Sequence, residues 1–183
     1  MISHINKGAD FGKTLNYLLG KEAAHIIDGN LSDLTPDPNR LAQEFEAIAN
    51  LNRRVKHKTY HISLSVPAHE PLNEKTWRQI ARQYLILMKL DANQYIAVKH
   101  EDTAHHHIHL LVNRVRTLDK KCTRDSWDFT RSMKAVRTIE AEFGLEHPNQ
   151  TRDRSDEMTP TQAASNPTFL PEAPTQEADF ELV

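Results

Sequence analysis

Apolar and polar residues alternate strictly in one segment of the chain. Residues 59–66 read Thr-Tyr-His-Ile-Ser-Leu-Ser-Val, with large apolar side chains at the even positions and His61, Ser63 and Ser65 at the odd positions. A period of two predicts a strand with one buried and one polar face. Residues 94–100 and 107–112 also favour strands, because they are rich in β-branched and aromatic residues.

A second set of segments has helical spacing. Residues 10–20 begin at a capping aspartate and end at a glycine, and residues 37–51 begin with Asp37-Pro38. Residues 73–90 have the strongest apolar stripe, and residues 125–143 precede Gly144. Each of the four segments predicts an amphipathic helix with one face in a core.

The order of these segments predicts the fold class. A short strand is expected at residues 1–6 and a strand or hairpin arm at 23–31, so the order is strand, helix, strand, helix, strand, helix, strand, strand, helix. This order predicts an α+β fold, with a central, mainly antiparallel sheet covered by helices. The connection between the last two strands is short, which favours antiparallel pairing between them.

Composition divides the chain into two parts. Residues 1–147 are expected to form one domain. Residues 148–183 are rich in Pro, Thr, Gln and Ser and carry seven acidic residues against two arginines, so they are expected to be a disordered acidic tail. No apolar run reaches membrane-spanning length, and the N-terminus lacks the apolar region of a signal peptide, so we expect a cytoplasmic protein without a membrane segment. The single cysteine, Cys122, excludes a disulfide within the chain.

Histidine is concentrated in one short stretch. Five of the eleven histidines lie between His100 and His109. His107 and His109 are two residues apart on a predicted strand and therefore share a face, and a neighbouring antiparallel strand brings His100 toward them. Three imidazoles with open positions are typical of a catalytic metal site. We expect His105 and His106 to lie in a solvated turn; the alternative is that the whole cluster is a solvated loop that traps metals adventitiously.

The net charge of −2 conceals clusters of basic residues. These clusters lie within residues 53–58, 114–124 and 131–137. Clustering on one face would provide an electrostatic surface for nucleic acid, although each cluster alone is compatible with an ordinary solvated surface. We predict that single-stranded DNA binds in a groove bordered by the first two clusters.

Tyrosines are candidate nucleophiles, and the pattern separates one of the four from the others. Tyr60, Tyr84 and Tyr95 fall on apolar faces or on the side opposite His100, whereas Tyr17 lies at the edge of the apolar stripe of its helix. Spacing alone favours an ordinary half-buried aromatic residue at this position.

The motifs together resemble a known family. His107-Ile-His109, with His100 upstream, Asp102 beyond it and Asn113 downstream, resembles the third motif of plasmid relaxases, the mobilization nucleases of the HUH endonuclease group. Tyr17 follows an N-terminal strand, and residues 61–65 form a serine-bearing strand, as in that family. The resemblance covers roughly residues 1–145 in a consistent order.

This resemblance implies a HUH relaxase-like palm and site- and strand-specific nicking at a transfer origin. It implies that Tyr17 attacks the scissile phosphate to form a 5′-phosphotyrosyl link, that His100, His107 and His109 bind a divalent ion, and that Asp102 orients a histidine or assists proton transfer. The ion is expected to be Mn, Mg or another first-row transition metal, and imidazole favours the transition metals. The expected DNA contacts are Lys13, Arg53, Arg54, Lys56, Lys58, Ser63, Ser65, Asn113, Arg114 and Arg116.

The expected partners are single-stranded or supercoiled DNA at a transfer origin, accessory mobilization proteins and a secretion coupling protein. The chain is expected to be a monomer in the bacterial cytoplasm. It is shorter than family members that carry long C-terminal regions, which indicates a minimal relaxase or a domain of a longer protein.

Two other functions stay open from the sequence. His105-x-His107-x-His109 imitates the pattern of histidine-triad nucleotide hydrolases and transferases, although His106 stands where that family has a hydrophobic residue. A non-enzymatic regulator that binds DNA or metal would also explain the basic clusters.

Overall fold

The computed structural model describes residues 1–101 and 105–147. Its centre is a five-stranded sheet in the order β1-β3-β5-β4-β2, and every neighbouring pair is antiparallel. The strands are β1 (Ile2–Gly8), β2 (His25–Gly29), β3 (Thr59–Val66), β4 (Asn93–His100) and β5 (His106–Arg116). The predicted antiparallel sheet and the predicted order of elements are both confirmed.

Four helices lie between and after these strands. They are α1 (Phe11–Leu19), α2 (Pro38–Ala49), α3 (Glu74–Met88) and α4 (Asp128–Phe143). The side chains of Asp10, Asp37 and Asn73 accept hydrogen bonds from backbone N–H groups in the first turns of α1, α2 and α3. These N-caps explain why the sequence locates the three helix starts well.

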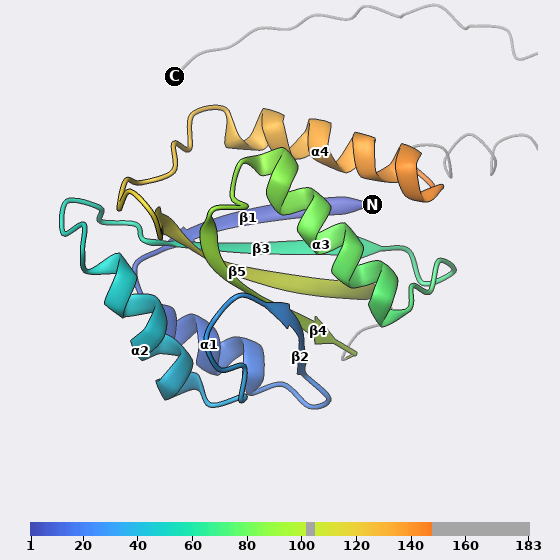
Figure 1. Cartoon of the computed structure of the whole chain (residues 1–183). Helices are drawn as coiled ribbons and strands as arrows, with labels where there is room; N and C mark the ends of the chain where they lie inside the picture. Colours follow the sequence, from blue (N-terminus) through green and yellow to red (C-terminus); the bar gives the residue numbers. More distant parts are fainter. Residues whose placement is uncertain (102–104, 148–183) are drawn as a thin grey trace, which may run out of the picture.

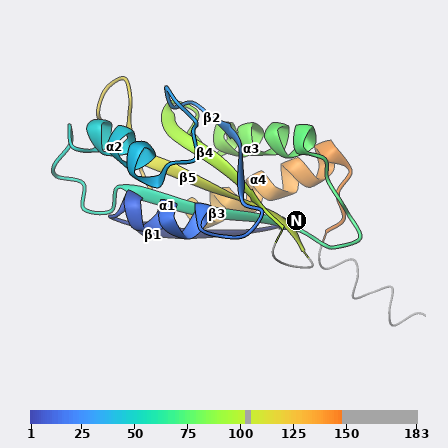
Figure 2. The same ribbon diagram turned by 90° about the horizontal axis from the view of Figure 1, so that it is seen from below.

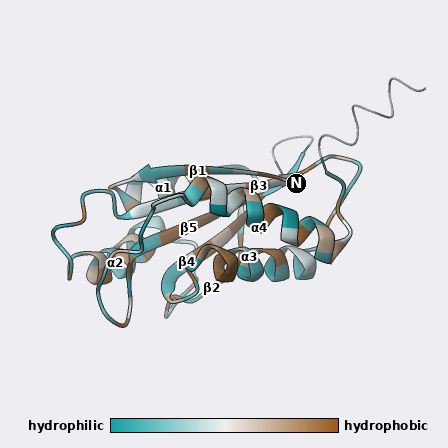
Figure 3. Cartoon of the chain, turned by 90° about the horizontal axis from the view of Figure 1, so that it is seen from above, coloured by the Kyte–Doolittle hydropathy of each residue, from teal (hydrophilic) through white to brown (hydrophobic). Residues whose placement is uncertain are grey.

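The helices form two pairs on opposite faces of the sheet. Helices α3 and α4 pack on the face that carries Tyr60, Ile62 and Ile108, and helices α1 and α2 pack on the face that carries Val98 and Leu111. Figures 1 and 2 show the two pairs as separate groups. The hydropathy colouring in Figure 3 shows β5 mainly brown in the middle of the sheet and β1 mainly teal at its edge. The fold is therefore an α+β sandwich with a core on each side of the sheet.

Helix α4 starts later than the sequence predicts. It begins at Asp128 instead of Asp125, because Trp127 has a left-handed backbone conformation (φ 59°). The Asp125 carboxylate is instead paired with Lys7 and Arg114. Asp128 also pairs with Lys7, so the start of α4 is tied to β1.

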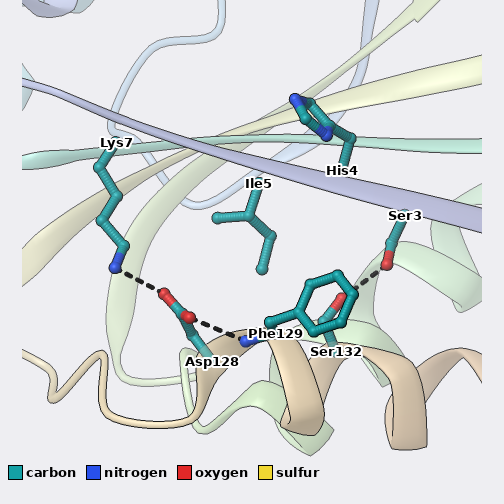
Figure 4. Close-up of a pocket in the computed structure, with 7 residues that line it drawn as sticks. All are labelled: Ser3, His4, Ile5, Lys7, Asp128, Phe129 and Ser132. Atoms are coloured by element: carbon teal, nitrogen blue, oxygen red, sulfur yellow. Dashed lines mark hydrogen bonds and ion pairs between the residues drawn. The ribbon is translucent and has the colours of Figure 1, made fainter.

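The contact between β1 and α4 surrounds a small cavity of about 270 Å³. Ser3 and Ser132 are hydrogen-bonded across it at 2.6 Å. Figure 4 shows Ser3, Ile5 and Lys7 pointing toward α4, while His4 points to the other side of β1. His4 therefore belongs to the sheet face that carries the predicted histidine site.

Within the described residues, no helix is long and apolar enough to cross a membrane. The expected acidic tail, residues 148–183, lies outside the described residues.

Candidate metal centre and nucleophile

Three of the clustered histidines meet on one face of the sheet. His100, at the end of β4, is the cross-strand partner of His107 on β5, and His109 lies two residues farther along β5. One ring nitrogen from each lies within 4.8 Å of the other two, and His100 and His109 are buried. The three imidazoles therefore lie together, as the sequence predicts.

Hydrogen bonds orient the three rings. His100 Nε2 donates to the carbonyl of Leu18 at 2.7 Å, and His107 Nδ1 donates to the carbonyl of His105 at 3.1 Å. Nδ1 of His109 lies 3.0 Å from Nε2 of His61. In each ring one nitrogen makes the orienting contact, so Nδ1 of His100 and Nε2 of His107 and His109 are the nitrogens suited to an ion.

The donor set fits a divalent transition metal. Metal–imidazole distances of about 2.0–2.1 Å put two ligands of one ion at most about 4.2 Å apart, so closure from 4.8 Å needs only small side-chain movements. Neutral imidazoles are borderline donors that suit Mn, Co, Ni or Zn better than Mg. These residues could hold an ion that polarises a phosphate oxygen.

His61 lies behind His109 on the neighbouring strand. Burial lowers the pKa of the His61 imidazole, and the nearby His100 and His4 lower it further. Neutral His61 can accept the Nδ1–H of His109, which would leave Nε2 of His109 as the ligand atom. The sequence placed His61 on the polar sheet face, but spacing along a single strand did not indicate this contact between strands.

Tyr17 lies on α1 next to the histidines. Its side chain is 52% exposed, and its ring centroid is 6.0 Å from that of His61 and 6.4 Å from that of His109. Its exposure follows from the helix, because Phe11, Leu15 and Leu18 form the buried stripe and Tyr17 falls beside it.

Two cationic side chains of the same region accompany Tyr17. Lys13 is exposed and lies one helical turn before Tyr17, so the two side chains share a face of α1. The Lys21 ammonium is 5.5 Å from the centroid of the Tyr17 ring. Lys21 was not among the residues singled out in the sequence, because its proximity depends on how the chain leaves α1.

The serines of β3 continue the same face. Ser63 is the cross-strand partner of both His109 and His4, and Ser65 is the partner of His107. Both serines are half-buried. They border the histidine cluster on the side of the exposed edge strand β1. His4 joins this surface only through the pairing of β1 with β3, which no local pattern indicates.

Two residues expected to contact DNA are buried and hold the fold together. Asn113 is fully buried, and its amide group donates to the carbonyl of Phe45 and to Gln94. Arg114 is 6% exposed and stacks over Tyr60, where it pairs with Asp125. Burial contradicts the expectation that either side chain contacts DNA directly.

The basic cluster that follows also differs from its prediction. Arg116 has the same parity along β5 as Ile108 and Arg114, so it lies on the face covered by α3 and α4, and it is paired with Asp119. Arg53, Arg54 and Lys56 are exposed, whereas Lys58 is half-buried and bonded to Asn50. The two segments lie side by side, since Asn52 donates to the carbonyl of Lys120 and Arg114 to that of His57. A DNA groove between them stays a prediction, but Arg114 and Arg116 are not on the histidine face.

The rest of the histidine stretch is divided between strand and loop. His105 is exposed, as expected for a turn, but His106 is the first residue of β5 and pairs with Val66. The expectation that His106 lies in the turn is wrong, because the strand begins earlier. Asp102 lies outside the described residues.

A comparison with known protein families identifies the family of this chain. Residues 17–145 match the family model described as relaxase, MobA/VirD2-like, nuclease domain. The match covers more than half of the 183 residues, so the chain belongs to the family of MobA/VirD2-like relaxase nuclease domains.

Two curated relatives are both described as Protein TraI of Escherichia coli. One is 25% identical over 156 residues, which are 82% of this chain and 21% of the relative, and the other is 24% identical over 145 residues, which are 77% and 19%. The chain thus spans about a fifth of the length of these relatives. A solved structure described as "Molecular Basis of Vancomycin Resistance Transfer in Staphylococcus aureus" has a TM-score of 0.49 and 12% identity, with 80% of this chain and 96% of that chain covered.

Proposed function

We propose that this domain nicks one DNA strand at the transfer origin of a plasmid or other mobile element, with Tyr17 as nucleophile. The observation that carries the proposal is the exposed Tyr17 ring within 6.4 Å of a three-histidine cluster, in a chain of the relaxase family. His105 is not part of that cluster, and His100 from the next strand takes the third place. This arrangement favours a relaxase over a histidine-triad enzyme.

In the proposed reaction the Tyr17 hydroxyl attacks the scissile phosphorus. A bond forms between the phenol oxygen and phosphorus, and the bond to the 3′-oxygen breaks. The phenol loses its proton and the leaving oxygen gains one, so that the products are a 5′-phosphotyrosyl link and a free 3′-hydroxyl. Attack by a 3′-hydroxyl reverses the step and rejoins the strand.

The residues around Tyr17 have separate roles in this proposal. His100, His107 and His109 would hold a divalent ion, which when bound neutralises charge on the phosphate. Lys13 and the serines of β3 would contact the DNA backbone beside the nick, and Asp102 would assist proton transfer or orient a histidine. Arg53, Arg54, Lys56 and Lys58 would bind flanking DNA. Accessory mobilization proteins and a secretion coupling protein would act with the domain, which we expect to be a monomer.

The test is incubation of the protein with supercoiled plasmid that carries its origin, in the presence of Mn²⁺, followed by SDS and protease. We expect relaxed circles with blocked 5′ ends, and none with Tyr17→Phe. His107→Ala should lose activity, whereas His106→Ala should keep it, because His106 is adjacent in sequence but points to the other face. Nicking by Tyr17→Phe at the wild-type level would refute the proposed nucleophile.

A further inference from the structure

A second concentration of charge lies on the sheet face opposite the histidines. A cavity of about 440 Å³ is lined by eight residues, five of which are cationic and none of which is acidic. The cationic residues are Lys89, Arg116, Lys121, Arg124 and Arg131. We call these five residues the basic corner.

Four parts of the fold build the basic corner. Lys89 is the left-handed cap at the end of α3, Arg116 is the last residue of β5, and Arg131 lies in the first turn of α4. Lys121 and Arg124 come from the segment between β5 and α4. Tertiary packing therefore adds Lys89 and Arg131 to three cations of the basic cluster at residues 114–124.

Among the described residues, most of these cations have no acidic partner. Arg116 is paired with Asp119. In residues 1–101 and 105–147, no carboxylate lies within 4.0 Å of the charged groups of Lys89, Lys121, Arg124 or Arg131. In the part of the chain that the structure describes, the side chain of Arg131 donates only to the carbonyl of Arg124, and its buried Nε has no hydrogen-bond partner. Cations gathered in a concave surface attract anions more strongly than isolated surface cations do.

An exposed aromatic residue adjoins the basic corner. Trp127 is 82% exposed, and its backbone carbonyl accepts the N–H of Arg131 at 2.9 Å. Cations that follow a phosphate backbone, next to an aromatic ring on which a base can stack, are the usual elements of single-strand binding. A duplex keeps its bases stacked and would leave the tryptophan unused.

We propose that the basic corner is a second binding site for single-stranded DNA, with phosphates on Lys121, Arg124 and Arg131 and a base stacked on Trp127. This inference rests on the proposed function, because the basic corner and the nicking site around Tyr17 would bind the same DNA strand. His109 and Arg116 are seven positions apart along β5, a distance of about 23 Å. The corner would therefore hold DNA several nucleotides away from the nick, where the strand passes round the end of the sheet.

Tryptophan fluorescence provides a direct test on the full chain. The chain has two tryptophans, and Trp77 is fully buried while Trp127 is exposed, so quenching by added DNA reports on Trp127. We expect long oligothymidine to quench the emission, and a duplex of equal length to quench it far less. Trp127→Phe should remove the quenching, and Trp127→Ala should weaken binding measured by anisotropy by roughly fivefold to 100-fold.

Charge reversal tests the phosphate contacts. The double variant Lys121→Glu, Arg124→Glu should lower affinity for oligothymidine at least about tenfold and reduce the salt slope by about 1.4, which is two contacts at about 0.7 each. Lys75→Glu is a matched control, because Lys75 is exposed at the far end of α3 from Lys89. If the double variant binds as tightly as Lys75→Glu, or if DNA leaves the emission unchanged, the second site is refuted.

Tyr17→Phe separates this inference from the proposed function. It should abolish nicking and leave the quenching intact, because Tyr17 lies on the other face. If DNA quenches the emission of the wild-type chain but no origin is nicked, the second site is supported and only the proposed nicking reaction is contradicted. If the wild-type chain nicks its origin but DNA does not quench the emission, only the second site is contradicted.

Discussion

Removal of the His61 imidazole should weaken metal binding without removing a ligand. His61 contacts Nδ1 of His109, with its Nε2 at 3.0 Å, and not the ring nitrogens that are proposed to bind an ion. In His61→Ala the Nδ1–H of His109 loses this acceptor. The ring of His109 is then free to adopt the other tautomer or to rotate away from the position that the ion requires.

The expected magnitude has a lower and an upper bound. One neutral hydrogen bond contributes about 0.5–1.5 kcal/mol, which is a factor of roughly 2 to 13 in affinity. Loss of an outer partner of a metal-ligating histidine typically costs about 10–100-fold. The two ranges overlap near tenfold, so we expect the dissociation constant for Mn²⁺ or Co²⁺ to rise by about 10-fold and by less than about 100-fold.

Competition with a chelating dye at one pH measures this change. His61→Gln should recover part of the affinity, because its side-chain oxygen can accept a hydrogen bond, and His61→Phe should not recover it. His4→Gln is the matched control, since His4 lies on the same sheet face beside Ser63 and is not one of the ligands. The Co²⁺ absorption spectrum should change in His61→Ala and stay unchanged in His4→Gln. Equal affinity and equal spectra for His61→Ala and wild type would refute the orienting role.

Two further predictions concern stability. Burial alone would raise the pKa of Asp28, but hydrogen bonds from Arg82 and Tyr95 outweigh it and hold the pKa below its usual value. The Asp28 carboxylate therefore stabilises the fold above about pH 4, and this contribution is lost as the pH falls through the lowered pKa. In urea unfolding, the free energy of unfolding of wild type should exceed that of Asp28→Asn by about 1–3 kcal/mol at pH 7, and the difference should shrink toward pH 3. A difference that is constant with pH would contradict this assignment. Gly144 has φ 65° with open space around its Cα, so Gly144→Ala should cost about 1 kcal/mol through backbone strain alone, whereas Gly12→Ala inside α1 should stabilise by about 0.5–1 kcal/mol. Thermal unfolding that shifts in the same direction for both variants would contradict the conformational reason.

The sequence predicts the elements of this fold better than their arrangement. The strict alternation at residues 59–66 and the capped helices are local patterns, and β3 and the four helices appear close to where these patterns predict them. The pairing of β1 with β3, across two helices and β2, has no local signal. That pairing brings His4 beside Ser63, and it makes β1 the edge strand next to the histidine cluster.

Only the part of the site whose position depends on period-two alternation and on one short connection could be predicted from the sequence. His107 and His109 follow from alternation, and His100 follows from the short link between β4 and β5. The same alternation separates odd from even positions, so it places Arg114 and Arg116 on the face opposite His107 and His109. The DNA contacts predicted at Arg114 and Arg116 ignored this parity, and Arg114 instead stacks over Tyr60 on the other face.

Tyr17 and the three-histidine cluster are joined through the backbone of α1. The carbonyl of Leu18 accepts the hydrogen bond of His100, and Tyr17 is the preceding residue. Leu18 and Leu15 are fully buried against α2 and the sheet, so the second core cluster holds the helix in place. A change in the seating of α1 would therefore move the tyrosine and the His100 ring together. In the proposed reaction, this shared support would keep the nucleophile and the ion at a fixed distance from each other. Local spacing around Tyr17 could not reveal this link, because the link depends on packing between α1 and the end of β4.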